Sequence, residues 1–193
     1  MPTAHAALDA LVAGLQARER WAAQDLHARM FERVRNLVWR LLGADQDHHD
    51  VVNQVFLNVL GAIGTLRDPA ALEGWVLAIT CNTVRREIRG RRYRRLLFKP
   101  FAAADEPVCE MRPGASELLR GFYAAAQRLA TEERLVFLLH YVDGQTLAEV
   151  AQVCGCSLAT AKRRLARART SFMKRCKDYP GLRAAIGELR DEN

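Results

Sequence analysis

The sequence predicts an all-α fold made of two small helical domains that are joined by a flexible linker. Almost every segment carries apolar residues at helical spacing, and no segment alternates apolar and polar residues in the manner of a strand. A proline-containing stretch over residues 96–114 divides the chain. The chain has 193 residues, half of them apolar, which is enough for two small packed cores.

The half before the linker is expected to hold four helices. They are predicted over residues 1–20 and 22–42, from Asp45 or Asp47 to Leu60, and over residues 72–94. Gly43 ends the second helix, and residues 61–71 form a loop that contains two glycines and Asp68-Pro69. The apolar residues of the third helix are Val51, Val52, Val55, Phe56, Val59 and Leu60, and the core candidates of the fourth are Trp75, Ile79 and Ile88.

Three prolines within a short distance mark the linker, and the second half is again helical. Helices are expected over residues 115–129 and 131–142, followed by a helix-turn-helix over 145–177. Pro180 stops the last helix. The predicted units are therefore an N-terminal extension (1–21), a first domain (22–95), the linker (96–114), a second domain (115–177) and a C-terminal tail (178–193).

The helix-turn-helix has a cationic second helix. Gly155 supplies a tight bend and Ser157 can cap the helix that follows. One stripe of that helix is apolar and consists of Leu158, Ala161, Leu165, Ala168 and Phe172. Arg163 and Arg167 fall on the opposite side, so this helix suits the major groove of DNA.

Positive charge is concentrated in two segments. Residues 85–99 carry a net charge of +7 and residues 162–177 carry +8. Since the whole chain carries +7, the remaining residues carry −8. Two basic patches on an otherwise acidic chain indicate two contact surfaces for a polyanion, rather than two solvated helix faces.

Several function classes are excluded by the sequence. No apolar run reaches the length of a membrane span and the N-terminus lacks a secretory signal, so we expect a cytoplasmic protein without membrane insertion or disulfides. Cys154-Gly155-Cys156, with His140 or Cys176, hints at a metal site, but the spacing is not a standard zinc pattern. We predict no metal, no cofactor and no catalytic residues, since the chain has no phosphate-binding loop and no nucleophile–base pair.

Three segments carry a resemblance to a known family. Residues 47–57 read DHHDVVNQVFL, residues 75–82 read WVLAITCN and precede the arginine run, and residues 146–169 end in TAKRRLARAR. In this order, and split by a linker, they resemble the extracytoplasmic-function class of sigma-70 family sigma factors. The resemblance covers about residues 22–95 and 115–174. It implies a region 2-like bundle, followed by a region 4-like helix-turn-helix.

For the first domain, the resemblance implies that region 2 opens the −10 promoter element and captures a flipped base of the single strand. Flipping costs a few kcal/mol, which a pocket and phosphate contacts must offset. The loop after the third helix corresponds to that pocket, and an asparagine amide can both donate to and accept from a base edge. The implied −10 residues are Leu66, Asn82, Arg85, Arg86 and Arg89. We take Trp75 as a core residue rather than a stacking platform.

For the second domain, the resemblance implies that region 4 reads the −35 element as duplex DNA. An arginine can contact guanine in bidentate fashion, which discriminates by about 1–3 kcal/mol. The implied −35 residues are Thr160, Lys162, Arg163, Ala166, Arg167 and Arg169. Arg164 sits beside the apolar stripe and is expected to pair within the domain.

The resemblance also implies protein partners. The third helix would meet the clamp of the largest subunit of core RNA polymerase through Asp47, Asp50, Asn53 and Gln54. The family commonly has Gln-Glu where this chain has Asn53-Gln54, so polymerase affinity is expected to be lower or tuned to a particular clamp. An anti-sigma factor, held between the two domains, is a further implied partner.

Other functions stay open at this point. A stand-alone helix-turn-helix regulator would bind duplex DNA without polymerase, and would leave residues 47–60 and 75–82 unexplained. A sigma-like protein that binds polymerase without opening promoters is favoured only by the Asn53-Gln54 change. A nucleic-acid enzyme has no residue set in this sequence to support it.

Overall fold

The computed structural model describes residues 4–43, 48–97 and 117–179. Within these ranges every regular element is a helix, so the all-α prediction is confirmed. Among these residues, no helix is both long and apolar enough to cross a bilayer. The predicted linker lies outside the description except for its first two residues, which belong to a longer fourth helix, and the C-terminal tail lies outside it from residue 180.

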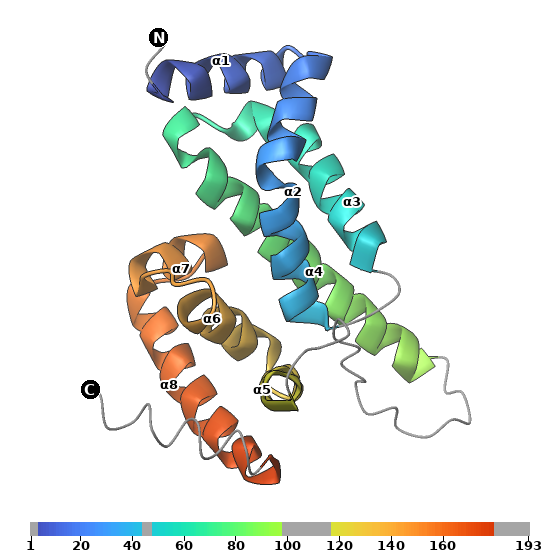
Figure 1. Cartoon of the computed structure of the whole chain (residues 1–193), viewed down its shortest axis with the longest axis vertical. Helices are drawn as coiled ribbons and strands as arrows, with labels where there is room; N and C mark the ends of the chain where they lie inside the picture. The colour runs from blue at the N-terminus through green and yellow to red at the C-terminus, as the bar shows by residue number, and fades with distance from the viewer. Residues whose placement is uncertain (1–3, 44–47, 98–116, 180–193) are drawn as a thin grey trace.

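The first unit is a four-helix bundle with two short turns (Figure 1). Its elements are α1 (Ala4–Gln16), α2 (Arg20–Leu42), α3 (His48–Ala62), the 3-10 turns η1 (Ile63–Thr65) and η2 (Pro69–Ala71), and α4 (Leu72–Leu97). Val34 and Val38 of α2 and Val55 of α3 are completely buried in its core. Gly43 ends α2 as predicted. Its φ of 85° favours glycine, and a Cβ there would collide with Gln127 of the second unit.

The segment before α4 forms two 3-10 turns at the surface, and its Ile63 and Leu66 side chains are buried. Leu66 is only 6% exposed, and its carbonyl accepts a hydrogen bond of 3.3 Å from Gln16 Nε2. Helix α1 contacts both η1 and η2, so this N-terminal helix covers the segment that the sequence marked as a loop. Asp68 caps η2 by accepting from the Ala70 amide.

The second unit holds the helix-turn-helix. Its elements are α5 (Glu117–Gln127), α6 (Thr131–Tyr141), α7 (Leu147–Cys154), α8 (Leu158–Arg175) and the turn η3 (Cys176–Asp178). Thr146 and Glu149 form a capping box at the start of α7. Gly155 ends α7 with a φ of 62°, and Ser157 caps α8 by accepting from the Thr160 amide. The predicted turn is therefore confirmed.

The two units touch along α4 and α7, with further contacts from α2 to α5 and α6 (Figure 1). Arg40 of α2 pairs with Asp143, and burial raises the pKa of Asp143 while Arg40 opposes that rise. Arg134 of α6 donates a hydrogen bond of 2.9 Å to the carbonyl of Leu41. Burial lowers the pKa of this guanidinium to about 10. Much of the junction is therefore polar.

Candidate nucleic-acid interface

The outward face of α8 is cationic. Its buried stripe contains Ala161, Ala168 and Phe172, which pack against the rest of the second unit. The predicted −35 residues lie away from that stripe. Thr160 is half-buried at the first turn, and the exposed ones are Lys162, Arg163, Ala166, Arg167 and Arg169. This arrangement presents several cations to a groove or a phosphate backbone.

Two acidic residues in the first turn of α6 lie against α8. Glu132 Oε2 is 2.9 Å from Arg164 Nη1, so the prediction that Arg164 pairs within its domain is confirmed. Glu133 Oε1 is 3.3 Å from Arg167 Nε. The Arg167 side chain remains 61% exposed, so it is still accessible from solvent.

The predicted −10 residues of α4 differ in their environment. Asn82, Arg86 and Arg89 are exposed. Arg85 instead faces the second unit, where its Nε donates to Glu132 Oε1 at 2.8 Å and its Nη2 donates to the Cys154 carbonyl at 3.1 Å. Burial lowers the pKa of Arg85, but the hydrogen bond and the charge of Glu132 outweigh that effect and leave it raised.

One carboxylate thus serves two arginines on different units. Glu132 binds Arg85 of α4 and Arg164 of α8 at the same time. Arg85 also donates to Asn82 Oδ1 at 2.7 Å, so the amide predicted to meet a base is tied into the same group. The sequence placed Arg85 on a phosphate, and the structure places it at the junction between the units.

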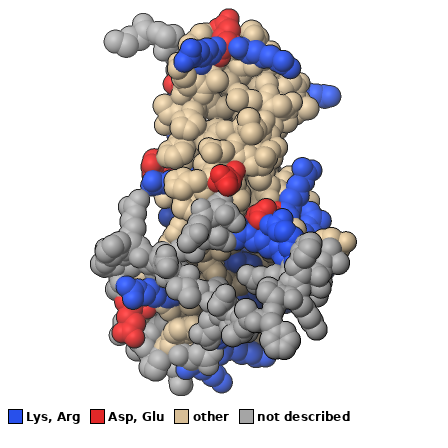
Figure 2. Space-filling view, turned by 90° about the vertical axis from the view of Figure 1, so that its right-hand side faces the viewer, with Lys and Arg blue, Asp and Glu red and all other residues tan. Residues whose placement is uncertain are grey.

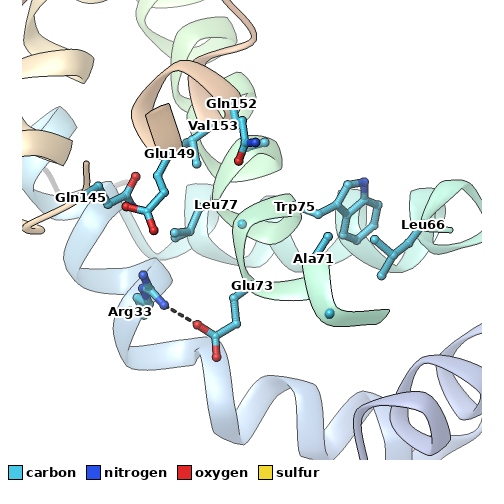
Figure 3. Close-up of a pocket in the computed structure, with 13 residues that line it drawn as sticks. Arg33, Leu66, Ala71, Glu73, Trp75, Leu77, Gln145, Glu149, Gln152 and Val153 are labelled. Carbon is cyan, nitrogen blue, oxygen red and sulfur yellow. Dashed lines mark hydrogen bonds and ion pairs between the residues drawn. The ribbon is translucent and has the colours of Figure 1, made fainter. Parts of the chain in front are cut away.

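A hollow of about 530 Å³ lies beside the segment before α4, between the two units (Figure 3). Leu66 and Trp75 lie at one end of it and Arg33 pairs with Glu73 at 2.6 Å near the other. Helix α7 and the turn before it close its far wall, through Gln145, Glu149, Gln152 and Val153. Trp75 is half-buried and packs against the core, so it is both a core residue and part of this wall.

The exposed face of α3 is both polar and apolar. Asp50, Asn53 and Gln54 are exposed there, while Asp47 lies outside the described residues. Two leucines on α3 are also exposed, Leu57 at 63% and Leu60 at 40%. Figure 2, viewed from the side on which α3 lies in Figure 1, shows a broad area without charged side chains over the first unit.

Sequence reasoning missed these two leucines as surface residues. Leu60 was counted among the apolar residues of the third helix, yet it lies at the edge of the buried stripe. Their spacing from Asn53, four and seven residues along the chain, would place all three on one helical face. That spacing could have identified Leu57 and Leu60 as residues of the exposed face.

The end of α4 is less cationic than its arginine count suggests. Glu87 accepts from Arg91 Nε at 2.7 Å and from Arg94 Nη2 at 2.9 Å. The hydrogen bond from Arg91 lowers the pKa of Glu87. That residues 91–95 contribute general electrostatics rather than base selectivity stays a prediction.

The cysteines form no metal centre in the described ranges, where no group of three or more His, Cys, Asp or Glu residues could hold a metal ion. Burial raises the pKa of Cys81 above its usual range, and raises that of Cys154 to about 11. Both thiols are therefore protonated at neutral pH. Cys156 is partly exposed.

Comparison with family models matches both units. Sigma-70 region 2 matches residues 26–94, and Sigma-70, region 4 matches residues 119–172. Together these segments make up more than half of the chain.

Curated relatives of this chain, at 27% or 28% identity, are named RNA polymerase sigma factors. The probable RNA polymerase sigma factor RfaY of Xanthomonas campestris pv. campestris is 28% identical over 63% of this chain and 32% of its own length. The ECF RNA polymerase sigma factor SigE of Mycolicibacterium smegmatis is 28% identical over 72% of this chain and 55% of its own length. The chain thus spans about a third and about half of these two relatives. SigM of Mycobacterium tuberculosis, also named an ECF RNA polymerase sigma factor, is 27% identical over 85% of this chain and 82% of its own length.

Two solved structures share the fold. CnrH in complex with the cytosolic domain of CnrY matches with a TM-score of 0.63 and 23% identity, over 88% of this chain and 96% of that one. The sigma factor RpoE in complex with the anti-sigma factor NepR, from Bartonella quintana, matches with a TM-score of 0.66 and 19% identity, over 80% of this chain and 96% of that one.

Proposed function

Since the chain belongs to the extracytoplasmic-function class of the sigma-70 family, we propose that it is a promoter-recognition subunit of RNA polymerase. It binds core polymerase in the cytoplasm, directs it to specific promoters and helps to open the DNA, with no catalytic chemistry of its own. The observation that carries the proposal is the joint presence of a region 2 match and a region 4 match in one chain, each with an exposed candidate contact face.

In this proposal, α8 enters the major groove at the −35 element. Lys162, Arg163, Ala166 and Arg167 face the bases, because they are exposed and lie off the buried stripe. Thr160 and Arg169 contact phosphates at the edges of the groove. Steep salt dependence follows, with a log–log slope of about −0.9 per duplex phosphate contacted.

The −10 role is assigned to α4 and the segment before it. Asn82, Arg86 and Arg89 are accessible to a single strand in the described arrangement. Arg85 becomes accessible only when its bonds to Glu132 and Cys154 break, so its use by DNA requires α4 to separate from α6 and α7. Since Leu66 is buried, it shapes the wall of the hollow rather than presenting a free side chain.

The polymerase contact is assigned to α3. Asp50, Asn53 and Gln54 supply polar contacts, and Leu57 and Leu60 add exposed apolar area that a partner would bury. These two leucines offset part of the loss expected where Asn53-Gln54 replaces the family's Gln-Glu. Asp47 remains part of the proposed contact, from the sequence pattern alone.

An inhibitory protein partner completes the proposal. One structure that shares this fold is a complex of a sigma factor with an anti-sigma factor. The hollow between the two units, with walls from α4 and α7, offers such a partner a surface that touches both. A protein bound there would hold the two units in a fixed relation.

Transcription in vitro tests the function. Purified core bacterial polymerase is assayed with and without this protein on a library of promoter fragments. Sequence-specific starts that depend on the protein are expected, and their alignment gives the −10 and −35 elements. Binding to core without any new transcript would instead identify a sigma-like protein that does not open promoters. Duplex binding without any affinity for core would identify a stand-alone regulator.

A further inference from the structure

The first turn of α6 supplies the acidic neighbours of the recognition helix α8. Glu132 and Glu133 follow one another, but they point to different arginines. Glu132 pairs with Arg164 and with Arg85 of the first unit, and Glu133 pairs with Arg167. The two acids therefore pair with different arginines. The partner of Glu133 is Arg167, which faces the groove in the proposed function.

The atom that Glu133 approaches is informative. Its Oε1 is 3.3 Å from Nε of Arg167, which is the inner nitrogen of the guanidinium. A guanidinium carries five N–H donors in a planar fork. The contact is an ion pair through Nε, which leaves the two terminal nitrogens free of this acid, and those are the donors suited to guanine O6 and N7.

The two side chains differ in burial, since Glu133 is largely enclosed by the protein and Arg167 is open to solvent. The side chain of Glu133 is 16% exposed, and that of Arg167 is 61% exposed. Glu133 sits on α6 two residues before the completely buried Leu135, so its backbone is fixed by the core. A fixed carboxylate restricts the rotamers of the arginine, which lowers the entropy lost when the arginine binds a base.

The neighbouring groove-facing cations lack such a support. In the part of the chain that the structure describes, no carboxylate lies within 4.0 Å of the nitrogens of Lys162 or Arg163. Arg167 thus differs from Lys162 and Arg163 in having an acidic partner within the protein. Oriented donors discriminate between bases better than unrestrained ones, because a misplaced fork makes one hydrogen bond instead of two.

We propose that Glu133 is a positioning residue for base reading by Arg167. Its charge keeps the guanidinium beside α6, with the terminal nitrogens available to one base pair of the −35 element, and so sharpens the preference for guanine there. This inference rests on the proposed function, because it requires that α8 reads duplex DNA.

Four variants of the full chain test it: Glu133→Gln, Arg167→Ala, the double variant, and Glu117→Gln as a control. Glu117, in the first turn of α5, is exposed, and its substitution changes the net charge by the same amount as that of Glu133. Each holoenzyme is titrated with duplexes that carry the −35 element found by transcription, and with duplexes changed at single base pairs. The measured quantity is the ratio of affinities for the original and the changed duplex.

Arg167→Ala should lower that ratio at one base pair by roughly 5- to 150-fold, the range of a bidentate contact. Glu133→Gln should lower it at the same base pair by about 3-fold or more, and should add nothing in the Arg167→Ala background. Glu117→Gln should leave every ratio unchanged. Because Glu133→Gln can disturb folding, Glu133→Asp provides a second test, since it keeps the charge but withdraws the carboxylate by one methylene.

The outcomes that contradict the positioning role can be told apart from the outcome that contradicts the proposed function. If both Glu133 variants keep the wild-type ratios while Arg167→Ala loses discrimination, the positioning role is wrong and the proposed function stands. If Arg167→Ala weakens all duplexes equally and reduces the salt slope by about 0.9, Arg167 contacts a phosphate and the inference also fails. If the wild-type holoenzyme shows no −35 preference at all, the proposed function itself fails.

Discussion

At the scale of single residues, partners within the protein decide which cations remain exposed. Arg85 and Arg163 look alike in the sequence, yet Arg85 is held by Glu132 and Arg163 is exposed. The sequence could identify both as cations, because charge is a local property. It could not identify the partner of Arg85, since Glu132 lies 47 residues away on the other side of the predicted linker.

The cap of α7 gives a prediction at this scale. Thr146 Oγ1 accepts from the Glu149 amide at 3.3 Å and satisfies a donor that the helix leaves unpaired. Thr146→Ala should therefore destabilise the protein by about 1 kcal/mol, measured by chemical denaturation. Thr170→Ala is the control, because that hydroxyl only bonds back to the Ala166 carbonyl within α8. Equal losses from both substitutions would contradict the capping role.

At the scale of elements, helix positions and the turn from α7 to α8 were predictable, and the packing of the segment before α4 was not. The turn from α7 to α8 was found because Gly155 and Ser157 are local signals with fixed roles. Residues 61–71 were predicted as a loop because they contain glycines and a proline. In the structure, residues 61 and 62 end α3, and η1 and η2 lie beside α1, where Gln16, 50 residues earlier, donates to the carbonyl of the buried Leu66.

The outer face of α3 gives a prediction at the element scale. Leu57 is 63% exposed, so Leu57→Ser should leave the thermal midpoint of the protein nearly unchanged. If the leucine is buried against the polymerase clamp, the substitution should weaken core binding by roughly fivefold or more, which is about 1 kcal/mol. Fluorescence titration with core polymerase measures the effect.

The matched control for this titration is Leu118→Ser on α5, which replaces another exposed leucine, at 43%, outside the first unit. It should leave core binding unchanged. Undiminished binding by the Leu57 variant, or an equal loss from both variants, would remove Leu57 from the polymerase contact.

At the scale of the whole molecule, the junction between the two units combines polar and apolar contacts. The polar ones include the Arg40–Asp143 pair, the bonds of Arg85, and the hydrogen bond from Arg134 to Leu41. The apolar ones include the edge-to-face contact of Trp39 with Tyr123, and the buried residues of both units form one hydrophobic cluster. Opening of the described arrangement therefore has to break both kinds of contact.

Thiol labelling can follow this opening. Cys154 is 6% exposed and its pKa is raised to about 11, so little thiolate is present near neutral pH and labelling should be slow. Glu132→Gln weakens the contact between α4 and the second unit and should speed the labelling of Cys154 several-fold, followed by mass spectrometry of the labelled peptide. Glu87→Gln is the control, because Glu87 pairs with Arg91 and Arg94 inside α4. Identical rates in both variants would show that Glu132 does not hold the units together.

The shared carboxylate of Glu132 has a thermodynamic consequence. Because it binds Arg85 and Arg164 at once, any ligand that draws Arg85 away also changes the surroundings of the recognition helix. Two sites that compete with one internal group are linked, and linkage is reciprocal. Engagement of the downstream element should then change the affinity for the upstream element by the same factor as the reverse, so the two elements should not act independently.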